Sequence, residues 1–237
     1  MRRFYVSPEN FNNLRIALSV EESKHLREVL RVRGGEEVHV FDGEGKEFLC
    51  SVEEIGSKKQ SAILQILNET KPASPESDLN LTLAVALLKG EKFDLVVQKA
   101  VELGVTKLVP ILTKRADTKT VRIERWQKIA IEAAKQSGRA KLMQIVELER
   151  FEDFVASSDG VKMLFAERGG GENFNTAEQS KKITAVIGSE GGWEDSEIEA
   201  ARKNDFQIIT FGGRILRAET AAVSIAAILQ HRFGDIS

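Results

Sequence analysis

Hydrophobic and polar positions alternate through much of the first 70 residues, a pattern typical of strands with one buried face. The run EEVHVFDGEGKEFLCSVEEI (36–55) predicts a hairpin closed by the turn DGEG. Its inward positions are Val38 and Val40 on the first strand and Phe48, Cys50 and Val52 on the second. The run SAILQILNE (61–69) alternates in the same way and predicts another strand.

One helix is expected within this β-rich part. Ser19 and Glu22 have the spacing of a capping box, and Leu26, Val29 and Leu30 follow at helical spacing. Short strands with a single helix over about 70 residues predict a small β-barrel. The polar stretch NETKPASPESD (68–78), which contains two prolines, has the composition of a linker and ends this part.

The hydrophobic period changes after residue 78. LNLTLAVALL (79–88) is a continuous apolar run typical of a buried strand, and the next apolar positions form one helical stripe over 93–103. Strand and helix patterns then alternate to a last helix over 219–233, which predicts an α/β domain with a mostly parallel sheet. The other expected strands are 107–112, 143–148, 161–167, 183–189 and 206–211, and the other expected helices are 124–136, 151–157 and 195–204.

Three of these strands run into glycine-rich sequences, namely VKMLFAERGGG, ITAVIGSEGGW and FGGRILRAETAA. Glycine lets backbone amides approach a ligand closely, and ligands bind at the carboxyl ends of parallel strands. None of the three matches GxGxxG or GxxxxGK[ST], so a dinucleotide or ATP site is not indicated. Each sequence alone is also compatible with a tight turn, but together they predict a pocket.

The third sequence places charged residues at the start of the last helix. The helix dipole favours Glu219 there, so a structural role explains it, whereas Arg217 gains nothing from the dipole. We therefore expect Arg217 to be balanced by a carboxylate, such as Glu190 or Glu219, or by an anionic ligand. For Arg214 structural and functional roles are equally well supported.

The composition is that of an ordinary globular protein, with 237 residues, 42% hydrophobic and 30% charged. Cys50 is the only cysteine, which excludes an internal disulfide and suits a reducing cytoplasm. The three histidines are scattered, so we expect no metal site. No signal peptide or membrane-spanning run is apparent, and a cytoplasmic location is expected.

A net charge of −2 argues against a positive electrostatic potential over the whole protein, but positive charge is concentrated between Thr113 and Lys141. That segment has an excess of six positive charges. Both a solvated helix face and an RNA-phosphate surface would explain it. Arg2 and Arg3 beside aromatic residues add a weaker indication of nucleic-acid contact.

Four sequences along the chain resemble the RsmE family of ribosomal RNA uridine-N3 methyltransferases, within the SPOUT superfamily. They are KGEKFDLVVQKAVELGV (89–105), RW followed by QSGR, IGSEGGW (187–193) and RILRAETA (214–221). The run HLREVLRVRGGEEVHVFDG resembles the N-terminal PUA-like barrel of that family. Ser189 departs from the family pattern, which usually has proline there.

The resemblance implies a PUA-like, RNA-binding β-barrel over residues 1–70, a linker over 71–78 and a SPOUT domain with a trefoil knot over 79–237. It also implies S-adenosylmethionine (SAM) as cofactor, a homodimer, and ribosomal RNA or the small ribosomal subunit as partner. The implied reaction is methylation of uridine N3 in small-subunit (16S) ribosomal RNA. The cofactor residues carried over are Phe165, Ala166, Gly188, Glu190, Gly191, Gly192, Phe211, Gly212, Ile215, Leu216 and Thr220.

Uridine N3 carries a proton, so an enzyme must help to remove it or stabilise the charge that spreads onto the base carbonyls. Arg217 is the candidate for charge stabilisation, and Glu219 is the candidate for orienting it; no general base is identified. The candidates for RNA contact are Arg2, Arg3, Arg115, Lys119, Arg122 and Arg139. A SPOUT ribose 2′-O-methyltransferase and a non-catalytic RNA-binding module remain as alternatives.

Overall fold

A computed structural model describes residues 2–57, 60–168, 180–210 and 213–236. By their internal contacts the residues divide into two compact units. The first comprises Met1–Glu76 together with Ala134–Leu142, and the second comprises Ser77–Ala133 and Met143–Ser237. This division separates a β-rich unit from an α/β unit, and the expected α/β class with a smaller N-terminal β domain is confirmed.

The first unit is built on a curled six-stranded sheet in the order β1-β4-β5-β6-β3-β2. The strands are β1 (Arg3–Tyr5), β2 (Phe11–Asn12), β3 (Arg15–Ala17), β4 (Glu37–Phe41), β5 (Glu47–Glu54) and β6 (Ile63–Thr70). β1 pairs with β4 in parallel, and the other neighbours are antiparallel. The expected hairpin is confirmed as β4–β5, with Val38 opposite Cys50 and Val40 opposite Phe48.

The predicted helix of this unit begins where the capping box placed it. α1 (Val20–Lys24) starts after Ser19, whose hydroxyl accepts the backbone N–H of Glu22, and continues as a π-helical turn, η2 (His25–Val29). A short 3-10 turn, η1 (Pro8–Asn10), precedes β2. Leu26 is buried against the inner face of the sheet, so one core serves both elements.

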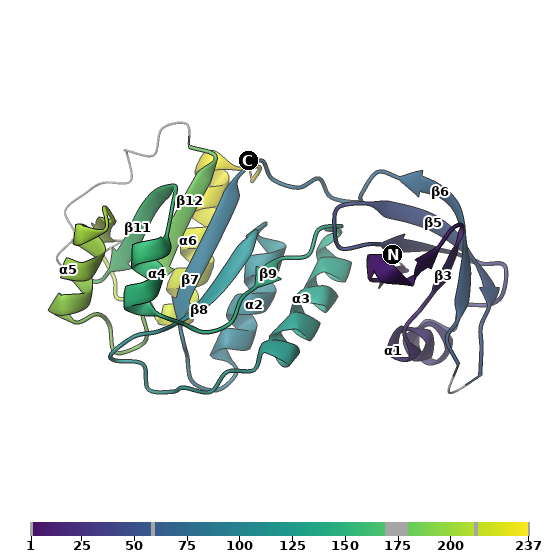
Figure 1. Cartoon of the computed structure of the whole chain (residues 1–237), viewed down its shortest axis with the longest axis horizontal. Helices are drawn as coiled ribbons and strands as arrows, with labels where there is room; N and C mark the ends of the chain where they lie inside the picture. The colour runs from purple at the N-terminus through teal and green to yellow at the C-terminus, as the bar shows by residue number, and fades with distance from the viewer. Residues whose placement is uncertain (1, 58–59, 169–179, 211–212, 237) are drawn as a thin grey trace. The chain divides into compact units, whose positions relative to one another are not determined.

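The second unit contains a seven-stranded sheet in which all described pairings are parallel (Figure 1). Its strands are β7 (Asn80–Ala86), β8 (Lys107–Leu112), β9 (Gln144–Ile145), β10 (Glu149–Arg150), β11 (Val161–Ala166), β12 (Lys182–Ile187) and β13 (Gln207–Thr210). The order is β10-β8-β7-β12-β11-β13, with β9 also on β8. β12 therefore lies between β7 and β11, and the strands β12, β11 and β13 are consecutive in the sheet.

Helices cover both faces of this sheet. They are α2 (Lys92–Glu102), α3 (Ile123–Ser137), α4 (Phe151–Ser157), α5 (Asp195–Lys203) and α6 (Ala218–Phe233). α4 and α5 share a hydrophobic core with one face, and α6 packs on β7, β12 and α2 behind it (Figure 1). All five helices lie within about two residues of their predicted ranges.

The expected single strand over 143–148 is wrong. Residues 144–145 pair with the beginning of β8 and residues 149–150 with its end. The chain follows one edge of β8 in two short contacts, and residues 146–148 separate them. The trefoil knot expected from the resemblance involves connections that include 169–179 and 211–212, which lie outside the described residues.

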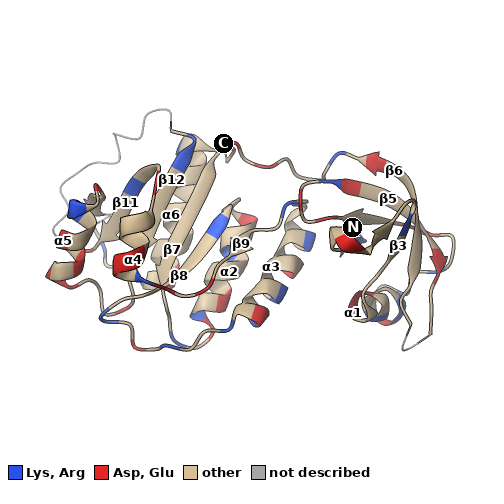
Figure 2. Cartoon of the chain, in the orientation of Figure 1, with Lys and Arg blue, Asp and Glu red and all other residues tan. Residues whose placement is uncertain are grey.

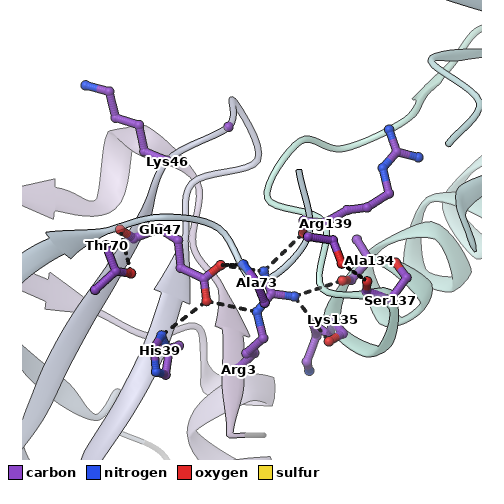
Figure 3. A network of polar contacts seen from close by, with 12 residues as sticks. Arg3, His39, Lys46, Glu47, Thr70, Ala73, Ala134, Lys135, Ser137 and Arg139 are labelled. Atoms are coloured by element: carbon purple, nitrogen blue, oxygen red, sulfur yellow. Dashed lines mark hydrogen bonds and ion pairs between the residues drawn. The ribbon is translucent and has the colours of Figure 1, made fainter. Parts of the chain in front are cut away.

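Residues 134–142 belong to the first unit because a buried ionic network holds them there (Figure 3). Arg3 makes two hydrogen bonds to the Glu47 carboxylate, Nε–Oε1 at 3.1 Å and Nη2–Oε2 at 2.9 Å. The same guanidinium donates to the carbonyl oxygens of Ala134, Lys135 and Arg139, at 2.9–3.2 Å. The carbonyls of Ala134 and Lys135 lie in the last turn of α3 and that of Arg139 lies just beyond its end, so Arg3 adds a donor to acceptors at the helix terminus.

The segment with linker composition is attached to the same network. The backbone N–H of Ala73 donates to Glu47 Oε2, and Ser74 bonds to the backbone at Ser137 and Gly138. Glu76 accepts from the Arg139 guanidinium at 2.8–3.2 Å. The segment of linker composition is therefore held to the first unit by several hydrogen bonds.

Candidate functional site

A pocket lies at the carboxyl ends of the neighbouring strands β12, β11 and β13. Its cavity volume is about 340 Å³, at the lower end of the range for small-molecule sites. Three segments supply most of its walls: residues 165–167 at the end of β11, residues 187–190 and 192–193 at the end of β12 and just after it, and residues 213–218 leading into α6. Ala221 and Ile225 of α6 complete it. The three glycine-rich sequences therefore converge on one pocket.

Most of the described residues expected to bind the cofactor line this pocket. They are Phe165, Ala166, Gly188, Glu190, Gly192, Ile215 and Leu216. Gly191 and Thr220 are adjacent in sequence to lining residues, while Phe211 and Gly212 lie outside the described residues. Arg217 and Arg214 also line the pocket.

Trp193 is a pocket residue that the sequence analysis did not single out. Its indole Nε1 donates to the carbonyl oxygen of Phe165 at 2.8 Å, and its ring packs against Phe151 with centroids 5.1 Å apart. A Cβ on Gly188 would lie 3.0 Å from the indole, so glycine there allows the ring to sit against the backbone. Trp193 thereby joins the loop after β12 to the end of β11.

Arg217 occupies the N-cap position of α6 in an extended conformation, and its side chain does not cap the helix. It is exposed, and its side chain makes no hydrogen bond or ion pair within the described part of the chain. Of the partners expected for Arg217, Glu190 accepts instead from Lys92 Nζ at 2.8 Å, while Glu219 and an anionic ligand remain as candidates. Arg217 thus faces the pocket with its charge available to a ligand.

Lys92 and Glu190 hold each other in their charged forms. Burial raises the pKa of Glu190, but the hydrogen bond and charge of Lys92, together with backbone hydrogen bonds to the carboxylate, outweigh burial, and the resulting pKa lies below the ordinary value. The same bond to Glu190 raises the pKa of Lys92. Lys92 opens α2, where the helix dipole disfavours a cation, so Glu190 offsets that cost.

Glu219 lies in the first turn of α6 and is buried. Its Oε2 atom has no hydrogen-bond partner among the described residues. Its negative charge contributes to the raised pKa of Lys92, while the positive charge of Arg217 opposes that shift. Glu219, Lys92, Glu190 and Arg217 therefore form one electrostatic group beside the pocket.

The predicted RNA-contact residues separate into two sets. Arg2, Arg115, Lys119 and Arg122 are exposed, although Arg2 pairs with Glu36 at 3.2 Å. Arg3 and Arg139 are buried and bond to Glu47 and Glu76. We therefore assign these two arginines a structural role in place of the expected RNA contact.

The positive excess between Thr113 and Lys141 is partly neutralised in the same way. Lys135 bonds to Glu22, and Arg125 to Asp94. Acidic and basic residues are interspersed along α2 and α3 (Figure 2). The exposed cations of this region are concentrated in the connection between β8 and α3, which contains Arg115, Lys119 and Arg122.

Comparison with known proteins decides the family. A model of the RNA methyltransferase domain matches residues 75–230, more than half of the chain, and a model of the RNA methyltransferase PUA domain matches 18–65. The chain is 34% identical to ribosomal RNA small subunit methyltransferase E of Aquifex aeolicus, over 98% of this chain and 100% of that one. The chain belongs to the ribosomal RNA small subunit methyltransferase E family. The protein of that name from Rickettsia conorii is 32% identical, over 95% and 93% of the two chains.

Solved structures of methyltransferase E relatives share the fold over the whole chain. One is ribosomal RNA small subunit methyltransferase E from Neisseria gonorrhoeae bound to S-adenosyl methionine, with a TM-score of 0.91, 33% identity and full coverage of both chains. A putative methyltransferase from Legionella pneumophila, in complex with SAM, has a TM-score of 0.89, 31% identity and 98% coverage of both. These similarities extend over both units of the chain.

No helix in the described ranges is long and apolar enough to cross a membrane. Among the same residues, no group of three or more His, Cys, Asp or Glu side chains is arranged to hold a metal ion.

Proposed function

We propose that this methyltransferase E family member transfers a methyl group from SAM to N3 of uridine in small-subunit ribosomal RNA. The observation that carries the proposal is the pocket, formed by three loops at neighbouring strand ends within the region that matches the RNA methyltransferase domain. The solved relatives described as SAM-bound support the same cofactor. The family's specificity for uridine N3 supports the choice of acceptor atom.

The pocket residues fit a nucleoside-containing sulfonium. Phe165, Ile187, Leu216 and Ile225 provide apolar surface for a purine, and we assign Ile215 and Leu216 to the adenine side. Ile215 is 74% exposed, so a bound ligand would cover an apolar side chain that now faces solvent. SAM, when bound, supplies the methyl group as an electrophile, and the protein is left with positioning and charge stabilisation.

Arg217 stabilises the negative charge that spreads onto the uridine carbonyls as N3 loses its proton. Two properties favour this role, its location on the pocket wall and the absence of a carboxylate partner in the described residues. Glu219 orients the start of α6 and, with Glu190 and Lys92, sets the electrostatic potential around Arg217. Removing one such preorganised charge costs about 100- to 1000-fold in turnover in well-studied enzymes.

We assign RNA contact to the exposed cations Arg2, Arg115, Lys119 and Arg122, because phosphate binding needs accessible positive charge. A homodimer and a cytoplasmic location are part of the same proposal. Both follow from the family resemblance and from a ribosomal substrate. The domain boundaries 1–70, 71–78 and 79–237 and the knot also belong to the proposal, because they rest on the resemblance.

The proposal is tested by incubating the purified full-length protein with SAM and either naked small-subunit ribosomal RNA or assembled small subunits. Digestion to nucleosides and mass spectrometry then identify the modified atom. The expected product is 3-methyluridine. A ribose 2′-O-methylated product, or no product despite SAM binding, would contradict the assigned reaction.

The role of Arg217 is tested in the same assay. Arg217→Ala is expected to lower kcat about 100-fold or more, while the affinity for SAM changes much less, because the lost interaction acts on developing charge in the RNA base. Arg202→Ala is a matched control, since Arg202 lies on α5 and pairs with Glu199. Near-normal turnover by a folded, SAM-binding Arg217→Ala variant would remove Arg217 from the mechanism.

A further inference from the structure

Two loops at the edge of the pocket are joined by hydrogen bonds running in opposite directions. The Ser189 hydroxyl donates to the carbonyl oxygen of Arg115 at 3.0 Å, and Arg115 Nη1 donates to the carbonyl oxygen of Gly191 at 3.2 Å. Ser189 is buried and lines the pocket. The connection after β8 is therefore attached to the loop after β12 at two points.

The packing between these loops is close. A Cβ on Gly191 would lie 2.9 Å from Arg115 Cβ and 3.0 Å from the Arg115 carbonyl oxygen, so any larger residue at 191 would push the loops apart. Gly191, which was expected to bind the cofactor, also lets the backbone of the pocket loop lie against Arg115.

Glu197 fixes the two loops on their other side. Its Oε1 accepts the backbone N–H of Lys114, and its Oε2 accepts the backbone N–H of Glu194, both at 2.9 Å. Glu197 is buried, and both of its oxygens are satisfied by backbone donors. Lys114 Nζ also donates to Ser196 at 2.7 Å. The backbone of residues 114–115 is thus held by hydrogen bonds to both Ser189 and Glu197.

The Arg115 side chain has hydrogen-bonding capacity to spare. A guanidinium carries five N–H donors, and in the described residues only Nη1 makes a hydrogen bond. Its nearest carboxylate oxygen, on Glu194, lies 3.8 Å from Nε, and the side chain is about half exposed. A phosphate could therefore bind the remaining donors while Nη1 stays on Gly191.

We propose that Ser189 and Arg115 form a latch through which RNA binding and SAM binding strengthen each other. The inference rests on the proposed function and assigns both residues a positioning role for the pocket. A phosphate bound to Arg115 would restrict its side chain and so hold the loop 188–193 in its pocket-forming position. By linkage, SAM would raise RNA affinity by the same factor as RNA raises SAM affinity.

The test measures binding of sinefungin, a SAM analogue that cannot transfer a methyl group, to the full-length protein by calorimetry, with and without saturating small-subunit ribosomal RNA. For the unsubstituted protein, RNA is expected to tighten sinefungin binding about fivefold or more. Ser189→Ala is expected to weaken binding about two- to tenfold, as for one lost hydrogen bond, and to raise KM for SAM more than it lowers kcat. Arg115→Ala is expected to abolish the tightening by RNA.

Matched variants separate the latch from general effects on folding. Ser158→Ala removes a hydroxyl that also donates to a backbone carbonyl, at the end of α4, and Arg202→Ala removes an exposed arginine. Both should bind sinefungin normally and keep the effect of RNA. Ser189→Thr and Arg115→Lys retain a donor and should recover part of the lost affinity. The double variant Ser189→Ala/Arg115→Ala should show non-additive effects, because both residues act on one loop.

The outcomes distinguish the latch from the function on which it rests. If the unsubstituted protein neither binds sinefungin nor methylates RNA, the proposed function fails. If it does both, the latch is overturned by any of three results: Ser189→Ala behaving like Ser158→Ala, RNA leaving sinefungin affinity unchanged, or strictly additive effects in the double variant.

Discussion

At the scale of single residues, Arg217 is informative because its side chain lines the pocket and has no carboxylate partner among the described residues. Lys92 forms an ion pair with the carboxylate of Glu190, whereas the Arg217 side chain lines the pocket. The helix-dipole argument alone identified Arg217 as a residue of interest. It could not show that Glu190 pairs with Lys92, because these two residues are 98 positions apart and are brought together only by the order of strands β7 and β12.

The Lys92–Glu190 pair predicts a pH-dependent contribution to stability. The pKa of Glu190 lies below its ordinary value of 4.5, so the stabilisation is complete above about pH 5 and is lost as pH falls through the lowered pKa. The pKa of Lys92 is raised above 10.5, so the alkaline limit lies above that value. Lys92→Met should lower Tm by about 1–3 °C near neutral pH, a modest effect because both side chains are partly exposed.

Thermal unfolding measured from pH 3 to pH 9 checks this expectation. The Tm difference between the unsubstituted protein and Lys92→Met should shrink below pH 4. Lys99→Met is the matched control, since Lys99 is on the same helix and pairs with Glu102 at similar exposure, but away from the pocket loop. A Tm difference that is constant over the whole pH range would mean that Lys92 stabilises the protein by packing alone.

At the scale of secondary-structure elements, hydrophobic periodicity predicted the strands and helices well because burial dictates it. The hairpin β4–β5 forms where it was predicted, and α6 begins within one residue of its predicted start. Periodicity failed at 143–148, where two-residue contacts with β8 leave no sustained alternation. It also could not show that Ser189 meets Arg115, because a hydrogen bond between two loops has no period.

The burial of Cys50 on strand β5 predicts how its thiol reacts. Cys50 is fully buried, opposite Val38, and burial raises the pKa of its thiol to about 12. The thiol should therefore remain protonated and unreactive toward iodoacetamide at pH 8 in the folded protein. Labelling followed by mass spectrometry should be slow without denaturant and rapid in denaturant, where the pKa returns to about 9.0. Rapid labelling of the native protein would place Cys50 outside the core.

At the scale of the whole molecule, composition predicted a linker over residues 71–78 but could not show that residues 134–142 belong to the first unit. Arg3 and Arg139 were predicted to be surface cations because arginine side chains are usually exposed. Their burial depends on Glu47 and Glu76, which the sequence does not mark as partners. A buried ion pair leaves no local pattern, since each member is an ordinary charged residue until the fold brings the two together.

The same substitution at the neighbouring residues Arg2 and Arg3 is therefore expected to destabilise the protein to very different extents. Arg3→Met leaves Glu47 buried without its cation and should reduce the free energy of unfolding by about 3–5 kcal/mol. Arg2→Met, at an exposed pair with Glu36, should cost at most about 1 kcal/mol. Urea unfolding followed by circular dichroism checks both. The double variant Arg3→Met/Glu47→Met should recover much of the loss, and equal effects of the two single variants would contradict the network.

The assignment of residues 134–142 to the N-terminal unit has a consequence during synthesis. The strands of that unit are all translated by residue 70, but the carbonyl groups that Arg3 binds belong to residues 134, 135 and 139. On the ribosome, the first unit must therefore wait for more than sixty further residues before its buried charges are satisfied. Until then, Glu47 has Arg3, His39 and the backbone N–H of Ala73 as partners, but Arg3 lacks its three carbonyl acceptors. The order of translation thus makes completion of the smaller unit depend on the synthesis of residues 77–133 of the larger one.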